Sequence, residues 1–291
     1  MGERIRKTAL MVALWAIFLW VGVPAPVAAV PPADLFQGVT HRLIKDGFDK
    51  EAIAALYARP GVAFDVDSVA LFFIHSEAKL DYGQFSRPEA IKRARAYMKR
   101  HAATLEKAQE KYGVDKEAIT AILLVETQLG RYTGRSVVIN TLSTMAALTD
   151  PEIRDYLYRK IPKDRRLSRR DFDKKARAKS DWAYRELKAL IEHARDQGLD
   201  AVAIKGSYAG AMGLSQFMPS NAVKLGVDGN KDGTVDLFDD ADAIFSIARY
   251  LEHHGWVKGI SRKKAHRVIR HYNNSTYYAD GVLAVADALK K

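Results

Sequence analysis

The spacing of apolar and polar positions predicts a mostly α-helical chain. Amphipathic patterns, with apolar residues three and four positions apart, cover residues 86–112, 181–197, 239–254 and 276–289. The stretch AITAILLVETQLGRYTG, residues 118–134, adds an apolar helix. Because the alternation typical of strands is scarce and no internal repeat is present, we expect a helical protein.

Capping residues give the expected ends of these helices. Ser86-Arg87-Pro88-Glu89 resembles a capping box with proline in the first turn, and it opens an amphipathic stretch that stops at Gly113. A later helix, DWAYRELKALIEHARDQ, is expected to stop at Gly198. Three further signals predict where helices begin, at Asp115, Ser180 and Pro219.

Glu126 is a lone carboxylate at the end of the apolar stretch. It lies three and four positions after Leu123 and Ile122, so it shares their apolar face. Burial among apolar groups disfavours a charged carboxylate and raises its pKa, which suits a general acid near neutral pH. The alternative is a helix-end glutamate that bonds backbone amides or pairs with Arg131.

The segment KGSYAGAMGLSQFMPSN, residues 205–221, predicts a ligand-binding loop. Its glycines allow the backbone to approach a ligand closely. Gln216 offers a donor and an acceptor, and Phe217 and Met218 offer apolar contact. Such a loop suits a sugar, whereas no phosphate-binding GxGxxG or GK[ST] pattern is present. The alternative is a glycine-rich turn between helices.

The segment HYNNSTYY, residues 271–278, is dense in tyrosine and asparagine. Tyrosine rings can stack on sugar rings, and asparagine can bond acetamido groups. The segment therefore indicates a second contact with a glycan, although core and helix-capping roles would give the same composition.

The segment DGNKDGTVDLFD, residues 228–239, matches the calcium loop of an EF-hand, with Gly233 at its sixth position and Val235 at its eighth. The twelfth position is Asp instead of the longer Glu, so affinity is expected to be reduced. We expect a structural calcium clip; the alternative is a degenerate acidic turn. The predicted ligands are Asp228, Asn230, Asp232, Thr234 through its carbonyl, Asp236 and Asp239.

The first 29 residues predict a cleavable signal peptide. They combine the basic start MGERIRK, an apolar run of 15 residues from Ala9 to Val23, and small residues near Ala29. The alternative, an uncleaved anchor, needs about 20 apolar residues. The chain has no cysteine, which excludes disulfides and a lipid-anchor cysteine. We expect a periplasmic or otherwise extracytoplasmic protein.

The charge of the chain is strongly positive and unevenly placed. The formal net charge is +11, and residues 159–179 contain eleven basic and three acidic residues, which gives +8 for that segment alone. We expect either a solvated surface segment or a patch that attracts an anionic membrane or wall polymer. Nucleic acid is not an expected partner, because no recognition motif for it is present.

Together these motifs resemble the lytic murein transglycosylase B family. VETQLGRYTG resembles its catalytic-glutamate motif, GSYAGAMGLSQFMPS its substrate-cleft motif, and YNNSTYY its C-terminal Tyr-Asn motif. DGNKDGTVDLFDDADAIFSIARYLEHHGW is similar to its EF-hand-like loop and following helix. The resemblance implies a lysozyme-like catalytic region over residues 86–291, after an N-terminal helical segment over residues 30–85.

The resemblance also implies a function. Glu126 would act as acid and then base in cleaving the bond between N-acetylmuramic acid and N-acetylglucosamine, leaving a 1,6-anhydro ring without an organic cofactor. The residues implied to hold the peptidoglycan strand are Ser207, Gln216, Tyr272, Asn273 and Tyr278. Two alternatives remain: a lysozyme-like muramidase that uses water, and a non-catalytic peptidoglycan-binding module.

The chain departs from the family pattern in two places. Only fifteen residues separate Trp256 from Tyr272, where many relatives carry a longer insertion that forms a small β domain. We therefore expect a more open cleft. Conversely, the basic segment 159–179 is expected to be an insertion.

Overall fold

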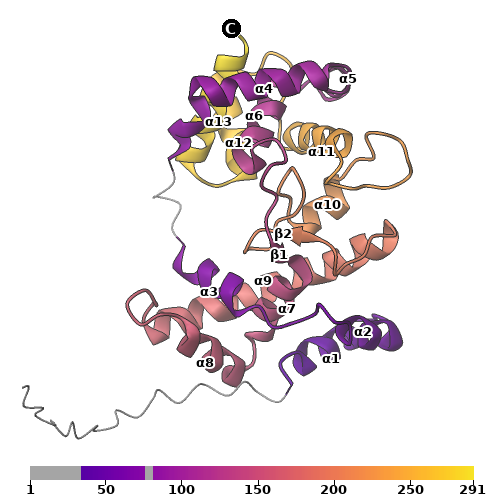
Figure 1. Ribbon diagram of the computed structural model, residues 1–291, viewed down its shortest axis with the longest axis vertical. Coiled ribbons are helices and arrows are strands. Elements are labelled where there is room, and N and C mark those ends of the chain that lie inside the picture. Colours follow the sequence, from indigo (N-terminus) through magenta and orange to yellow (C-terminus); the bar gives the residue numbers. More distant parts are fainter. Residues whose placement is uncertain (1–33, 76–80) are drawn as a thin grey trace, which may run out of the picture.

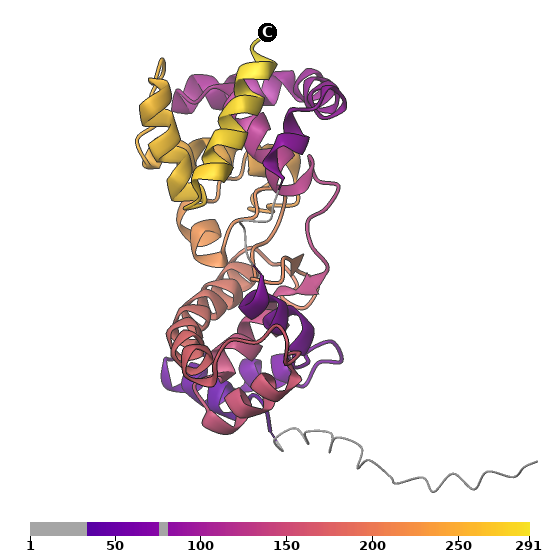
Figure 2. The same cartoon turned by 90° about the vertical axis from the view of Figure 1, so that its left-hand side faces the viewer.

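The computed structural model describes residues 34–75 and 81–291, and the expected leader of residues 1–29 lies outside them. The described part is mostly helical, which confirms the predicted class. Figure 1 shows one group of helices at each end of the long axis with a short ribbon between them, and Figure 2 shows the same separation. None of the described helices combines the length and the apolar character that a membrane span requires.

The first group is built around the long helix α9. Helix α7 packs along α9, and α1 and α3 pack on α7. The Phe73 and Phe172 rings meet in this core, with centroids 4.8 Å apart. Two of these helices have aspartate N-caps: the carboxylates of Asp49 and Asp65 accept N–H groups of the first turns of α2 and α3. The group comprises α1 (Gln37–Lys45), α2 (Lys50–Tyr57), α3 (Val66–Ile74), α7 (Val138–Ala147), α8 (Pro151–Lys160) and α9 (Arg169–Asp196).

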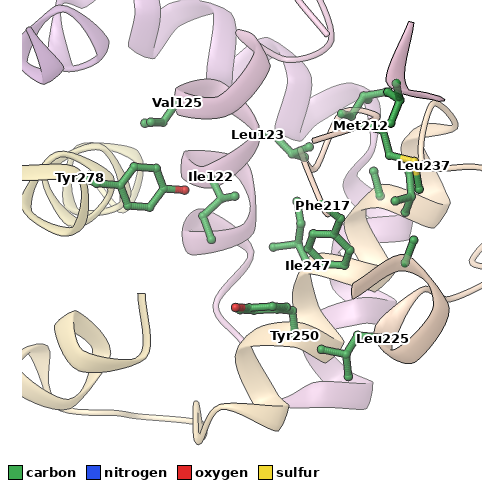
Figure 3. Packing of buried hydrophobic residues seen from close by; sticks show 14 of the residues in the cluster. Ile122, Leu123, Val125, Met212, Phe217, Leu225, Leu237, Ile247, Tyr250 and Tyr278 are labelled. Carbon is green, nitrogen blue, oxygen red and sulfur yellow. The ribbon is translucent and has the colours of Figure 1, made fainter. Parts of the chain in front are cut away.

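The second group surrounds α6, which packs against α4, α5, α11 and α13. Nine of the twelve residues of α6 are buried, so this helix is the centre of the core. Figure 3 shows Ile122 and Leu123 among the packed apolar side chains. The group comprises the 3-10 helix η2 (Tyr82–Ser86), α4 (Pro88–Arg100), α5 (Ala102–Tyr112), α6 (Lys116–Thr127), α11 (Asp240–His253), α12 (Arg262–Tyr272) and α13 (Thr276–Leu289).

A two-stranded ribbon and helix α10 (Pro219–Leu225) lie between the groups (Figure 1). Strands β1 (Ser136–Val137) and β2 (Lys205–Gly206) are antiparallel, with Ser136 opposite Gly206. The two segments approach closely at Gly134, which has φ 101°, and a Cβ there would lie 1.9 Å from the carbonyl oxygen of Gly206. Glycine is required at 134 on both counts.

The predicted helix over residues 86–112 is wrong in its continuity and in its cap. The chain bends at His101 (φ −105°, ψ 25°), so α4 and α5 are separate helices. Ser86 ends η2, and α4 has no side-chain cap. Gly113 ends α5 in the left-handed conformation as predicted. Asp115 lies at the N-cap of α6, but its carboxylate bonds Lys290 Nζ at 2.8 Å instead of a helix amide.

The predicted start at Ser180 is also wrong. Helix α9 begins after Ser168, whose hydroxyl accepts the N–H of Asp171. Ser180 is buried within α9 and donates to the carbonyl of Ala146 at 2.7 Å. The basic segment 159–179 therefore comprises the end of α8, a connection and the first turns of α9. The predicted start at Pro219 and the predicted helix over residues 276–289 are confirmed.

Candidate active site

Glu126 lies in the last turn of α6 and is partly exposed. The helix ends directly after it, because Gln128 and Leu129 both have positive φ, 51° and 63°. Their N–H groups return to the carbonyls of Leu124 and Leu123 at 3.0 and 2.9 Å. Left-handed backbone at a non-glycine residue costs about 1–3 kcal/mol, and such strain gathers at functional sites.

The Glu126 carboxylate is bonded to a tyrosine of the C-terminal helix. Tyr278 Oη donates to Glu126 Oε1 at 2.6 Å, across 152 positions of sequence. Tyr278 is 2% exposed and lies in the first turn of α13, where the N-cap Ser275 accepts its N–H. Figure 3 shows its ring directed from α13 toward α6, beside Ile122. Packing thus fixes the hydroxyl that holds the carboxylate.

A second tyrosine supports the first. Tyr272, the last residue of α12, stacks on Tyr278 with ring centroids 6.4 Å apart and planes at 10°. Its hydroxyl donates to the carbonyl of Ser215 at 2.5 Å. Burial raises the pKa of both tyrosines, and the nearby charge of Glu126 raises it further. Both hydroxyls therefore remain protonated donors around neutral pH.

The glycine-rich segment folds into a tight loop that is attached to α6. The Ser207 hydroxyl accepts the N–H groups of Ala209 and Ala211 at 3.3 and 3.1 Å, so it organises the loop itself. Thr127, next to Glu126, donates from Oγ1 to the carbonyl of Leu214 at 3.1 Å. This bond fixes the loop relative to the end of α6. The sequence pattern gave Thr127 no role, although it is a polar residue on a buried helix.

Gln216 and Phe217 differ in their exposure, so only Gln216 is open to a ligand. Gln216 is partly exposed, and its Nε2 donates to the carbonyls of Thr133 and Gly213 at 3.1 and 2.9 Å. Phe217 is 1% exposed and packs against the ring of Tyr272, with centroids 5.7 Å apart. Phe217 therefore supports Tyr272 from behind, which differs from the predicted apolar contact with a ligand.

Asn273 follows Tyr272 directly as the C-cap of α12, in extended backbone and partly buried. Its carbonyl accepts the N–H of Ser275 at 2.7 Å. The contacts thus join Glu126, Tyr278 and Tyr272 into one cluster, which Phe217 supports. Helix α12, which the pattern did not predict, positions Tyr272 in this cluster.

The acidic loop of residues 228–239 is organised by its own side-chain oxygens. The Asp228 carboxylate accepts the N–H groups of Lys231 at 2.6 Å and Gly233 at 2.9 Å. Asn230 and Asp232 each accept the amide two residues further on, at 2.9 and 2.8 Å. Gly233 has φ 93°, as a sharp turn at the sixth position requires. These oxygens turn inward along the loop.

Two carboxylates, Asp239 and Asp242, lie where this loop joins α11. Asp239 caps α11, since its carboxylate accepts the N–H groups of Ala241 and Asp242 at 2.8 and 3.2 Å. Asp242 faces the loop instead and accepts the N–H groups of Gly229 and Asp236 at 2.8 and 2.7 Å. Asp242 is fully buried, and burial raises its pKa. Within the described ranges, no three His, Asp or Glu side chains form a metal-ready group by themselves.

Known proteins resemble the chain in sequence and in fold. Residues 33–263 match the family described as the transglycosylase SLT domain. Membrane-bound lytic murein transglycosylase B of Escherichia coli (strain K12) is 33% identical over 176 residues, which are 60% of this chain and 41% of that protein. The chain therefore spans less than half the length of this relative.

Two solved structures share the fold. Soluble lytic transglycosylase SltB1 of Pseudomonas aeruginosa has a TM-score of 0.71 and 25% identity, over 87% of this chain and 97% of that one. SltB3 of the same organism, solved in complex with NAG-anhNAM-pentapeptide, has a TM-score of 0.69 and 22% identity, over 87% of this chain and 78% of that one.

Proposed function

The chain belongs to the transglycosylase SLT domain family, and from this premise we propose that it is a peptidoglycan lytic transglycosylase. It cleaves the β-1,4 bond between N-acetylmuramic acid and N-acetylglucosamine and leaves 1,6-anhydromuramoyl ends. The observation that carries the proposal is the hydrogen bond from Tyr278 to Glu126 at 2.6 Å, which holds a carboxylate by a neutral donor. The activities named for the relatives support it.

In the first step, protonated Glu126 gives its proton to the glycosidic oxygen as the bond from that oxygen to C1 of the muramoyl sugar breaks. Carboxylate charge develops on Glu126 in this step. The Tyr278 hydroxyl donates to that carboxylate, and a hydrogen bond to a charged group contributes about 1.5–3 kcal/mol. The tyrosine therefore lowers the barrier most where the charge is greatest.

In the second step, the Glu126 carboxylate takes the proton of the muramoyl 6-hydroxyl as O6 bonds to C1. One glycosidic bond is broken and one ring bond is formed, no water is consumed, and Glu126 ends protonated. One carboxylate therefore suffices, in contrast to the paired carboxylates of most glycosidases. We place the glycan against Ser207, Gln216, Tyr272 and Asn273, with Phe217 behind Tyr272.

The test is the mass of the muropeptides released from purified peptidoglycan, with Glu126→Gln alongside. Products one water lighter than hydrolytic products, and absent with the variant, support the proposal. Full-mass products with reducing ends would identify a muramidase. Glycan binding without products from either protein would identify a binding module.

We also propose a structural calcium ion in the loop of residues 228–239. The donor set fits a hard cation, since the inward-facing oxygens belong to Asp228, Asn230 and Asp232, and the carbonyl of Thr234 follows them. Asp242 faces the loop from α11, and one carboxylate oxygen of Asp239 caps that helix. Calcium bound here would fasten the loop to α11 and raise the melting temperature.

We propose an extracytoplasmic location, where the substrate is found, and contact of the basic segment 159–179 with an anionic wall polymer. Part of the segment's charge is paired, since Arg169 bonds Asp155 and Asp173 at 2.5 and 3.0 Å. Lys163, Arg165 and Arg170 remain exposed. Neutralising these three residues is expected to weaken wall binding and its salt dependence, and unchanged binding would refute this contact.

A further inference from the structure

We propose that an arginine-lined pocket beside the end of α6 binds a carboxylate of the substrate's peptide stem. This inference rests on the proposed function. The pocket has a volume of about 310 Å³ and lies between α4 and the segment that follows α6. Its three charged lining residues are all cationic: Arg93, Arg100 and Arg131.

These guanidinium groups have no partner in the described part of the chain. None of the three is in an ion pair or donates a hydrogen bond there. The Nε of Arg93 is buried without an acceptor. Arg100 and Arg131 are exposed and Arg93 is partly exposed, so the outer N–H groups of these side chains are open to a ligand from solution.

The structure offsets only part of the positive charge. Helices α4 and α6 both end at the pocket, and each C-terminus carries roughly −0.5 charge, so together they offset about one of three positive charges. Tyr97 lines the pocket, but its hydroxyl donates to Asp240 at 2.6 Å. The pocket therefore retains an excess of positive charge. Guanidinium forks bind carboxylate or phosphate through paired hydrogen bonds, so an oxyanion is the ligand that fits.

The position of the pocket identifies the source of the oxyanion. Gln128 and Leu129, two of its lining residues, begin two positions after Glu126 and have the left-handed backbone that ends α6. One wall of the pocket is therefore formed by the backbone segment that follows the catalytic carboxylate. The substrate's muramoyl unit carries a peptide stem, and the stem carries carboxylates. A bound stem would therefore position the muramoyl unit relative to Glu126.

The experiment compares two substrates, namely peptidoglycan with its stems and the same glycan after an amidase has removed them. Anhydro products are quantified by mass spectrometry for the full chain and for the double variant Arg93→Gln/Arg131→Gln. Lys99→Gln is the matched control, because Lys99 is exposed on α4 outside the pocket lining. Arg131→Lys tests whether charge alone suffices, and melting temperatures verify that each variant is folded.

We expect the double variant to lose about 5- to 20-fold in kcat/KM on the stem-bearing substrate and less than about twofold on the bare glycan. The Lys99 variant should match the unaltered protein on both. Equal losses on both substrates, or no loss on either, would overturn the proposal. If inorganic phosphate binds in the pocket while stems make no difference to the unaltered protein, the source is a free anion and the stem assignment fails. If the unaltered protein cleaves neither substrate, the proposed function itself has failed.

Discussion

Replacing Tyr278 by Phe removes one hydroxyl and leaves the packing around it intact. The ring is 2% exposed and stacks on Tyr272, so phenylalanine fills the same space. The change deletes the 2.6 Å hydrogen bond to Glu126 Oε1. A hydrogen bond to a charged group contributes about 1.5–3 kcal/mol, so at about 2 kcal/mol the rate falls about 30-fold.

The pH dependence should change with the rate. The Tyr278 hydroxyl stabilises the charged carboxylate of Glu126 over the neutral acid, so without it Glu126 should keep its proton to higher pH. The alkaline decline in activity should therefore begin at a higher pH in the variant. The assay is the rate of anhydro-muropeptide release across pH, with unfolding measured in parallel. Tyr277→Phe is the matched control, because Tyr277 is 68% exposed one position earlier on the same helix. A Tyr278→Phe enzyme that keeps full activity and an unshifted profile would refute the role of Tyr278 in stabilising the Glu126 carboxylate.

Three further substitutions test other parts of the protein. Gly134→Ala should destabilise the fold by at least about 2 kcal/mol in urea unfolding, because its Cβ would meet the Gly206 carbonyl at 1.9 Å; unchanged unfolding would contradict the close approach. The hydrogen bonds from Arg59 lower the pKa of Asp200 to about 2 from its usual 3.8, so the pair stabilises the fold above about pH 4, and this contribution is lost as the pH falls toward 2. Asp200→Asn should therefore be less stable than the unaltered protein near pH 6 and equal to it near pH 2, and a difference in stability that does not change with pH would contradict this. Asp242→Asn should abolish the rise in melting temperature on adding calcium, whereas a rise of the same size would show that Asp242 is not a calcium ligand.

Local signals in the sequence predicted those parts of the fold that local chemistry determines. Gly113 ends α5 because glycine readily adopts the left-handed conformation, and Pro219 begins α10 because its ring fixes a helical φ. The start of α9 was misplaced because Ser168 and Ser180 are both acceptable caps by composition. Ser180 is buried inside the helix because its hydroxyl finds the Ala146 carbonyl of α7, a contact that no local pattern contains.

In the candidate site, too, the residues could be predicted from the sequence but the contacts between them could not. The resemblance indicated Glu126, Tyr272 and Tyr278, but it gave no contact between them, since the bond from Tyr278 to Glu126 spans 152 positions. Phe217 packs against Tyr272 because the core buries the Phe217 ring, and the sequence does not show which ring is buried. Asp242 escaped prediction because the EF-hand pattern ends at its twelfth position, whereas α11 turns a residue beyond that position back toward the loop.

In the proposed mechanism, Glu126 activates a sugar hydroxyl and not water. Digestion of peptidoglycan in heavy-oxygen water tests this directly, because a hydrolase must place one solvent oxygen at each new reducing end. A lytic transglycosylase is expected to release muropeptides that carry no heavy oxygen and end in an anhydro ring. Heavy oxygen at the new ends would contradict it and make the protein a muramidase.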